Sequence, residues 1–201
     1  MTGGYIKLPK PVFTGHMSLE EVLYLRRSYR RFKDKPLNMK EISQLLWAAY
    51  GTNRWGKKVV PSAGATYPLE IFLVVRDGGV VGLDPGVYRY LPDDHALELI
   101  LKGDVSDALC RACLSQGWVK DAAINVIIGA IYERATGWYG ERGIRYVLFE
   151  VGHSGQNVML QATALGLGSV IIGAFIDNEV AKVLKLPRNV KPLYVIPIGR
   201  I

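Results

Sequence analysis

The residues best suited to chemistry lie in the segment Arg26–Arg31, R-R-S-Y-R-R, which places four arginines and a serine at the end of an expected helix. Guanidinium groups this close together repel one another unless an anion neutralises them. Their planar N–H donors and the serine hydroxyl match the oxygens of a phosphate monoester. The segment therefore predicts a phosphate-bearing partner and leaves open whether this is a nucleic acid, a membrane surface or a cofactor.

Other chemistries have weaker support. Cys110 and Cys113 form a C-x-x-C pair, but the chain has no further cysteine and its histidines are scattered, so no metal site is predicted. Both cysteines are expected to be half-buried helix residues. His153 and Ser154 are neighbours on an expected helix and point about 100° apart, which excludes a nucleophile–base pair. A buried, hydrogen-bonded His153 is the favoured interpretation.

Two further segments offer groups to a ligand. The loop Pro61–Pro68, P-S-A-G-A-T-Y-P, sets small residues between prolines, so its backbone is stiff and accessible to a flat ligand. A plain loop stays an open alternative. Arg200 follows Gly199 at the end of the last expected strand, where a further guanidinium can join the same phosphate. Gly166 and Gly168, by contrast, follow a helix and open a strand, the reverse of a dinucleotide-binding glycine loop.

Composition restricts the remaining classes. The 201 residues, 49% hydrophobic and 21% charged, suit one domain spanning 1–201, and the net charge of +7 favours anionic partners. Residues 1–5 lack the apolar core of a signal peptide, so a cytoplasmic location is expected. The stretch 151–176 contains no Asp, Glu, Lys or Arg, but its five glycines and its His, Gln and Asn residues argue against membrane insertion. It predicts a buried helix at about 142–165 and a buried strand at about 168–175.

Local patterns predict the elements that must position these groups. Ser18-x-x-Glu21 and Asn38-x-x-Glu41 are capping boxes, and the second helix is expected to end at Gly51. Another helix is expected at about 104–116. Strands are expected at Leu69–Arg76, Val87–Tyr90, Leu97–Leu101, Ala123–Tyr132 and Leu193–Ile198. The fold class is therefore α+β, with a mixed, mostly antiparallel sheet.

Taken together, short blocks along the chain resemble the nitroreductase superfamily of FMN-dependent oxidoreductases, most closely its SagB-type dehydrogenase branch. The blocks are R-R-S-Y-R (26–30), L-L-W-A-A-Y-G (45–51), P-S-A-G-A-T-Y-P-L-E (61–70), G-V-Y-R-Y (86–90), Y-G-E-R-G-I-R-Y (139–146), A-L-G-L-G-S-V-I-I-G-A-F (164–175) and I-G-R (198–200). This resemblance implies a three-layer α/β/α sandwich and a homodimer with FMN at each of two interface sites.

The resemblance also implies three groups of FMN contacts. The phosphate and ribityl chain would be held by Arg26, Arg27, Ser28, Arg30 and Arg200. The partner subunit would contribute Pro61, Ser62, Ala63 and Gly64. The isoalloxazine would lie beside Ile171, Ile172 and Gly173, with a backbone N–H near N5.

The chain departs from its relatives at two places. Many nitroreductases have Asn and Gln in the Pro61–Pro68 loop where this chain has Ala65 and Tyr67, so their substrate specificity does not transfer. The SagB-type branch is thought to use a Lys-Tyr pair for proton removal. Arg145-Tyr146 falls at that position, but arginine stays protonated and is a poor base. Tyr146 is the one catalytic candidate.

The implied function is ping-pong hydride transfer through flavin N5, with NAD(P)H as reductant and a small organic acceptor or a SagB-like azoline as substrate. One alternative is a non-redox flavin-binding or flavin-fragmenting protein. A remote alternative is a nucleic-acid-binding protein that uses Arg26–Lys35, where aromatic and basic residues alternate. On the leading hypothesis neither a nucleic acid nor a membrane is a partner.

Overall fold

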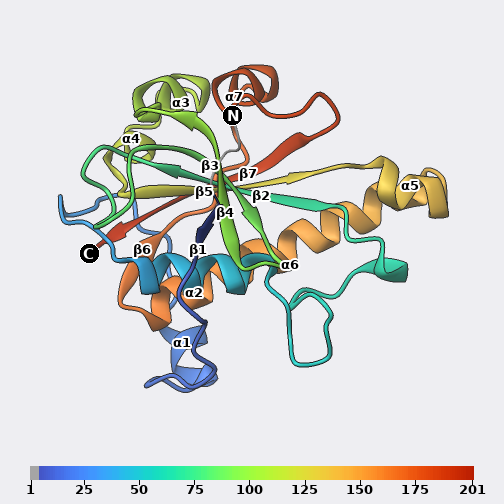
Figure 1. Cartoon of the computed structure of the whole chain (residues 1–201), viewed down its shortest axis with the longest axis horizontal. Coiled ribbons are helices and arrows are strands. Elements are labelled where there is room, and N and C mark those ends of the chain that lie inside the picture. The colour runs from blue at the N-terminus through green and yellow to red at the C-terminus, as the bar shows by residue number, and fades with distance from the viewer. Residues whose placement is uncertain (1–4) are drawn as a thin grey trace.

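A computed structural model describes residues 5–201 (Figure 1). Residues 1–4 lie outside the described residues. They are most of the stretch 1–5, in which the sequence shows no apolar core of a signal peptide. The strands are β1 (Tyr5–Lys7), β2 (Leu69–Val75), β3 (Gly86–Leu91), β4 (Ala96–Lys102), β5 (Ile124–Ala130), β6 (Leu167–Ser169) and β7 (Lys191–Arg200). The helices are α1 (Leu19–Leu25), α2 (Met39–Tyr50), α3 (Ser106–Ala112), α4 (Trp118–Asp121), α5 (Glu133–Tyr139), α6 (Arg142–Ala164) and α7 (Asp177–Val183), with one 3-10 turn, η1 (Ala63–Ala65).

The seven strands form one sheet in the order β1-β4-β3-β2-β5-β7-β6, and all neighbouring strands run antiparallel. Helices cover both faces, α2 and α6 on one side and α3, α4 and α7 on the other (Figure 1). The predicted α+β class and three-layer sandwich are therefore confirmed. Strand β1 and helices α4, α5 and α7 had no counterpart among the expected elements.

Alternation along the central strands builds the two cores. In β2, Ile71 and Leu73 pack toward α2 and α6, whereas Phe72 and Val74 pack toward α3 and α7. Both faces of this strand are buried, which explains its continuous run of apolar residues. Helix α2 packs against α6, where the Ser154 hydroxyl donates to the carbonyl of Ala49 at 2.8 Å. The sheet and these two helices form the frame of the site.

The predicted helix starts are largely confirmed. At α2 the Asn38 side chain accepts from the Glu41 amide, and the Glu41 carboxylate accepts from the Asn38 amide, which completes the capping box. At α1 the Ser18 hydroxyl accepts from the Glu21 amide at 3.1 Å, the half of that box which the structure shows. Helix α2 ends at Gly51 as predicted.

Four expectations need correction. The strand expected at 168–175 is only Leu167–Ser169, followed by a single bridge between Ile172 and Val195. The helix expected at 104–116 is only Ser106–Ala112, because the chain turns through left-handed conformations at 114 and 115; Cys110 and Cys113 are buried rather than half-buried. His153 is exposed, because its neighbour Ser154 faces α2 and successive helix residues point about 100° apart.

Within residues 5–201, no helix combines the length and the apolar character needed to cross a membrane. The same residues contain no group of three or more His, Cys, Asp or Glu side chains suited to a metal ion.

Candidate functional site

The arginine segment, residues 26–31, runs along the sheet edge immediately after α1. Arg26 is the C-cap of that helix, and Ser28 then forms a parallel bridge with Ser169 of the edge strand β6. The Tyr29 amide donates to the Ser169 carbonyl at 2.9 Å. A Cβ at Gly168 would lie 2.9 Å from Tyr29 Cβ, so glycine allows this close approach. The backbone of the arginine segment is therefore tied to β6.

The side chains of the arginine segment are far less constrained than its backbone. Among residues 5–201, no carboxylate lies within ion-pair distance of Arg26, Arg27, Arg30 or Arg31. Arg27 lies over the Tyr29 ring at 4.9 Å, and all of these arginines are exposed except the half-buried Arg26. Unneutralised guanidinium groups beside the exposed Ser28 fit the phosphate of FMN.

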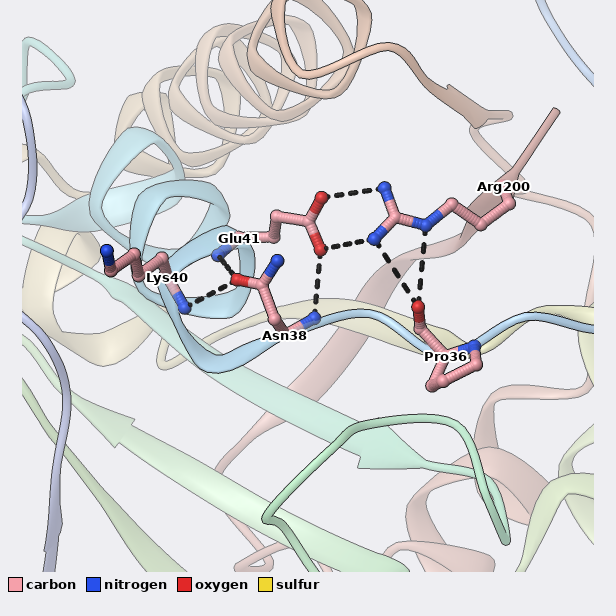
Figure 2. Close-up of polar contacts among 5 residues, drawn as sticks. All are labelled: Pro36, Asn38, Lys40, Glu41 and Arg200. Carbon is pink, nitrogen blue, oxygen red and sulfur yellow. Dashed lines mark hydrogen bonds and ion pairs between the residues drawn. The ribbon is translucent and has the colours of Figure 1, made fainter.

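Arg200 pairs through its backbone with Leu167 of β6, the strand that the arginine segment bridges. Its side chain already has a carboxylate partner (Figure 2). Its Nη1 and Nη2 atoms donate to the two oxygens of Glu41 at 2.7 and 2.8 Å. The Glu41 carboxylate also accepts from the Asn38 amide at 2.9 Å, and the Arg200 guanidinium reaches the Pro36 carbonyl at 3.4 Å. Arg200 thus joins the end of β7 to the start of α2, and its contact with a phosphate stays a prediction.

The residues expected beside the isoalloxazine continue from the same sheet edge. Ile172 exchanges two hydrogen bonds with Val195 of β7, at 2.9 and 3.0 Å. In such a ladder the neighbouring amides point the opposite way, toward the unpaired edge. The amides of Ile171 and Gly173 accordingly have no acceptor within the described part of the chain. This edge offers backbone N–H donors to a flat polar ligand, which fits a flavin ring.

The Pro61–Pro68 loop has a different character, because its backbone is bent and internally bonded. Gly64, Ala65 and Tyr67 all have positive φ, at 57°, 52° and 45°. Such conformations are costly for residues other than glycine and persist only where surrounding contacts hold them. The Ser62 hydroxyl accepts from the Tyr67 amide at 3.0 Å, and the Ala65 amide donates to the Ser62 carbonyl. Ser62 therefore closes the loop on itself.

Aromatic residues hold one side of this loop. A Cβ on Gly64 would lie 2.5 Å from the Tyr139 hydroxyl, so Tyr139 at the end of α5 lies directly against the backbone there. The rings of Tyr139 and Tyr146 meet edge to face with centroids 5.0 Å apart. Tyr146, the catalytic candidate near the start of α6, therefore contacts Tyr139, which in turn contacts the loop.

The buried carboxylate of Glu150, which was not among the expected site residues, lies on the other side of the loop. Glu150 of α6 is 2% exposed, and its Oε1 accepts from the hydroxyl of the equally buried Tyr50 at 2.6 Å. Burial raises the pKa of Glu150, and hydrogen bonds from Tyr50 and Ser62 oppose this shift. Burial also raises the pKa of Tyr50, with the Glu150 charge adding to the shift. The signal for Glu150 was its position immediately before the charge-free stretch that begins at Val151.

The two halves of the expected site lie at different ends of α6. The Pro61–Pro68 loop contacts Tyr139 and Glu150 near the start of this helix, whereas the arginine segment bonds to Ser169 beyond its end. From Glu150 to Ala164 an α-helix rises about 21 Å. Figure 1 shows the same separation, with α5 at one end of α6 and β6 with the C-terminus at the other. The structure thus brings the arginine segment and the backbone of Arg200 to one end of the β6–β7 edge. Ile171–Gly173 lies farther along β7, with Ile171 against Gly155 of α6, and the loop lies near Glu150.

An apolar stripe lies on the outer surface of the first turns of α6. Ile144, Leu148 and Phe149 recur at helical spacing and are 44–56% exposed. Leu23 and Tyr24 of α1 are also exposed, at 50% and 88%. Large apolar patches of this kind mark contact surfaces.

The sequence of this chain matches a known protein family and several known proteins. The sequence pattern of the Nitroreductase family matches residues 23–200. MJ1384 of Methanocaldococcus jannaschii, a candidate nitroreductase, is 51% identical over 185 residues, covering 92% of this chain and 91% of that protein. The microcin B17-processing protein McbC of Escherichia coli is 34% identical, over 82% of this chain and 63% of McbC. This chain therefore spans less than two thirds of McbC.

Solved structures agree with the sequence matches. A candidate nitroreductase of Ralstonia eutropha superimposes with a TM-score of 0.84 and 29% identity, covering all of this chain and 91% of the other. The E. coli microcin synthetase McbBCD complex with truncated pro-MccB17 contains a chain that superimposes with a TM-score of 0.75 and 30% identity, covering 96% and 77%. The family pattern over residues 23–200, the relative that is 51% identical and the shared fold together show that the chain belongs to the nitroreductase family, a family of oxidoreductases.

Proposed function

We propose that this protein is an FMN-dependent oxidoreductase that works as a homodimer and takes reducing equivalents from NAD(P)H. The observation that supports this most strongly is the arginine segment. Within residues 5–201 its guanidinium groups have no carboxylate partner, and its backbone is bonded to the same sheet edge at which the Ile171 and Gly173 amides have no acceptor. A phosphate and a flat heteroaromatic ring joined in one molecule match these two features. A cytoplasmic location stays a prediction from the sequence.

Bound FMN would supply ping-pong hydride transfer through N5, and the protein would bind and orient it. Arg26, Arg27 and Arg30 would neutralise the phosphate, and the Ser28 hydroxyl would donate to one of its oxygens. Ile171 and Gly173 would donate backbone N–H groups to the ring, and the buried Ile172 would hold this segment on β7. Arg200, fixed by Glu41, would add positive potential near the phosphate.

The homodimer follows from the separation along α6. Within one chain, the Pro61–Pro68 loop lies near Glu150, whereas the arginine segment bonds to Ser169 beyond the end of α6, about 21 Å farther along that helix. A two-fold related copy packed on the stripe Ile144, Leu148 and Phe149 would bring one chain's loop to the other chain's arginine segment. Pro61, Ser62, Ala63 and Gly64 would then cover the flavin and exclude water.

The acceptor substrate is proposed as a small organic molecule or a modified peptide. The peptide option rests on McbC, whose name describes processing of microcin B17, and on the McbBCD complex with truncated pro-MccB17. Tyr146 is the proposed catalytic residue for proton transfer, since it lies beside the loop through Tyr139. Arg145 cannot serve as its basic partner, so azoline oxidation would need a different base.

The decisive experiment is flavin binding followed by reduction. Purified protein is expected to acquire flavin absorbance on incubation with FMN, and NADH or NADPH is expected to bleach it in stopped-flow mixing. Protein that stays colourless would overturn the proposal. Flavin that binds but is bleached by neither nucleotide would instead indicate the non-redox alternative. A panel of quinones, nitro compounds and azoline peptides would then identify the acceptor by its reoxidation of the reduced flavin.

A further inference from the structure

A second polar cleft, separate from the arginine segment, lies where β2 begins and β3 ends. It has a volume of about 440 Å³ and is lined by the start of β2, the end of β3 and the segments around residues 56–58, 67 and 92–94, with Arg134 of α5 at its rim. A cavity of this size suits a small molecule. None of its lining residues belongs to the arginine segment, to Ile171–Gly173 or to Arg200.

One buried carboxylate organises the charges of this cleft. Glu70 is 7% exposed, and its Oε2 accepts from Arg89 Nε at 2.9 Å and Nη2 at 2.8 Å. Its Oε1 accepts from Arg134 Nη2 at 2.7 Å. A single negative charge thus holds two guanidinium groups, one on each oxygen.

The other charged groups lining the cleft form ion pairs of their own. Lys58 pairs with Asp93 within the lining, and Asp94 pairs at 3.5 Å with Lys7, which lies outside it. When each pair, including Lys7, is counted as neutral, the two arginines against Glu70 leave one positive charge in excess. The Arg89 and Arg134 side chains are 36% and 39% exposed, so this excess charge is accessible from solvent.

Hydrogen-bond donors are also left over. Arginine has five N–H groups, and within residues 5–201 neither Arg89 Nη1 nor Arg134 Nε has an acceptor. Glu70 limits the motion of both guanidinium planes, which lowers the entropy lost when they bind a further anion.

We propose that this cleft binds the anionic group of a small molecule, a carboxylate or a phosphate, between Arg89 and Arg134, with Glu70 orienting both. Arg134 Nη1 also donates to the Tyr67 carbonyl at 3.0 Å, and Tyr67 lines the same cleft. Occupancy of the cleft therefore bears directly on the Pro61–Pro68 loop. The proposal concerns the cleft alone and does not depend on flavin chemistry.

Calorimetric titration of the full chain with benzoate and with phenyl phosphate tests it. Arg89→Lys keeps a cation beside Glu70 but loses the planar fork, and is expected to weaken the better probe about tenfold. Glu70→Gln keeps the shape of the side chain at position 70 and removes its negative charge, so the positive charge of the cleft rises by one. This variant is expected to bind the probe severalfold more tightly. Preference for benzoate indicates a carboxylate ligand, and preference for phenyl phosphate indicates a phosphate ligand.

Two matched controls locate the bound probe. Arg26→Ala in the arginine segment and Arg188→Ala on the exposed surface are expected to leave binding in the cleft unchanged. Binding weaker than about 10 mM for both probes would overturn the proposal. So would binding that Arg26→Ala reduces and Arg89→Lys does not. Thermal melting checks the fold of each variant, and Arg89→Lys decides alone if Glu70→Gln does not fold.

Discussion

The arginine segment and the Pro61–Pro68 loop, the two halves of the proposed flavin site, are built on opposite physical principles. The arginine segment has a fixed backbone and free side chains, whose charges have no partner among the described residues. The loop has modest side chains and a strained backbone held by Ser62, Tyr139 and Glu150. The arginine segment can bind an anion through charges that have no partner among the described residues. The loop instead holds its shape before any ligand binds.

This contrast predicts how each half responds to mutation. A change in the arginine segment removes a ligand contact and leaves no buried group unpaired, so binding falls and stability does not. A change in the loop disturbs strained backbone and a buried carboxylate, so stability falls first. The four predictions below test this division, and the first asks whether the two halves meet at all.

The largest effect is expected for Phe149→Glu on the apolar stripe of α6. A charge placed in an apolar interface is strongly unfavourable, so the variant should be monomeric and lose FMN affinity by roughly a hundredfold or more. Sedimentation velocity and FMN titration measure both. Val81→Glu, at a residue 62% exposed on a different surface, is the control. A Phe149→Glu dimer that still binds FMN would remove α6 from the proposed interface.

Arg26→Ala is expected to weaken FMN ten- to a hundredfold, because one charge-assisted phosphate contact contributes about 1.5–3 kcal/mol. Riboflavin, which lacks the phosphate, should bind variant and parent alike. The free energy of unfolding should change by less than about 0.5 kcal/mol. Arg188→Ala is the control for overall charge. Unchanged FMN affinity in Arg26→Ala would show that the arginine segment does not bind the phosphate.

Gly64→Ala is expected to lower the free energy of unfolding by about 1–2 kcal/mol or more, from the left-handed backbone alone. The added methyl would also meet the Tyr139 hydroxyl. Gly78→Ala is the matched control, since Gly78 has φ of 64° but open space around its Cβ position. Chemical denaturation compares the two variants. Equal losses would mean that Tyr139 does not restrain the loop.

The smallest effect concerns pH. The folded protein raises the pKa of Glu150 above its ordinary value of 4.5, so the native state binds this proton more tightly than the unfolded state. Its contribution to stability is therefore full below pH 4.5 and is lost as pH rises through the folded pKa. Glu150→Gln should flatten this part of the stability profile, whereas Arg26→Ala should leave its slope unchanged. Identical profiles for parent and Glu150→Gln would contradict the assignment.

Much of the fold follows from local patterns. The central strands, both ends of α2 and the span of α6 could be predicted because apolar runs, caps and glycine stops act over a few residues. The strand expected after Gly168 could not, since its pairing depends on which amides of β7 remain available. The exposure of His153 does not follow from the charge-free stretch either, because that stretch does not reveal that only one side of α6 faces α2.

The candidate site divides in the same way. The arginine segment is visible in the sequence because its residues are contiguous. The pairs Arg200–Glu41 and Tyr50–Glu150 are not, because they join residues 159 and 100 positions apart. Neither a charge count nor helical periodicity reveals such partners. The cleft around Glu70 is also invisible in the sequence, because its two arginines come from β3 and α5.

The position of β7 has a consequence for the order in which the protein can fold. The last strand of the chain lies inside the sheet, between β5 and β6, and β6 has no other strand partner. Until residues 191–200 leave the ribosome, β5 ends in an open edge, and the arginine segment has no completed strand pair to dock on. Pairing of β6, and with it the docking of the arginine segment on Ser169, therefore depends on β7 being in place.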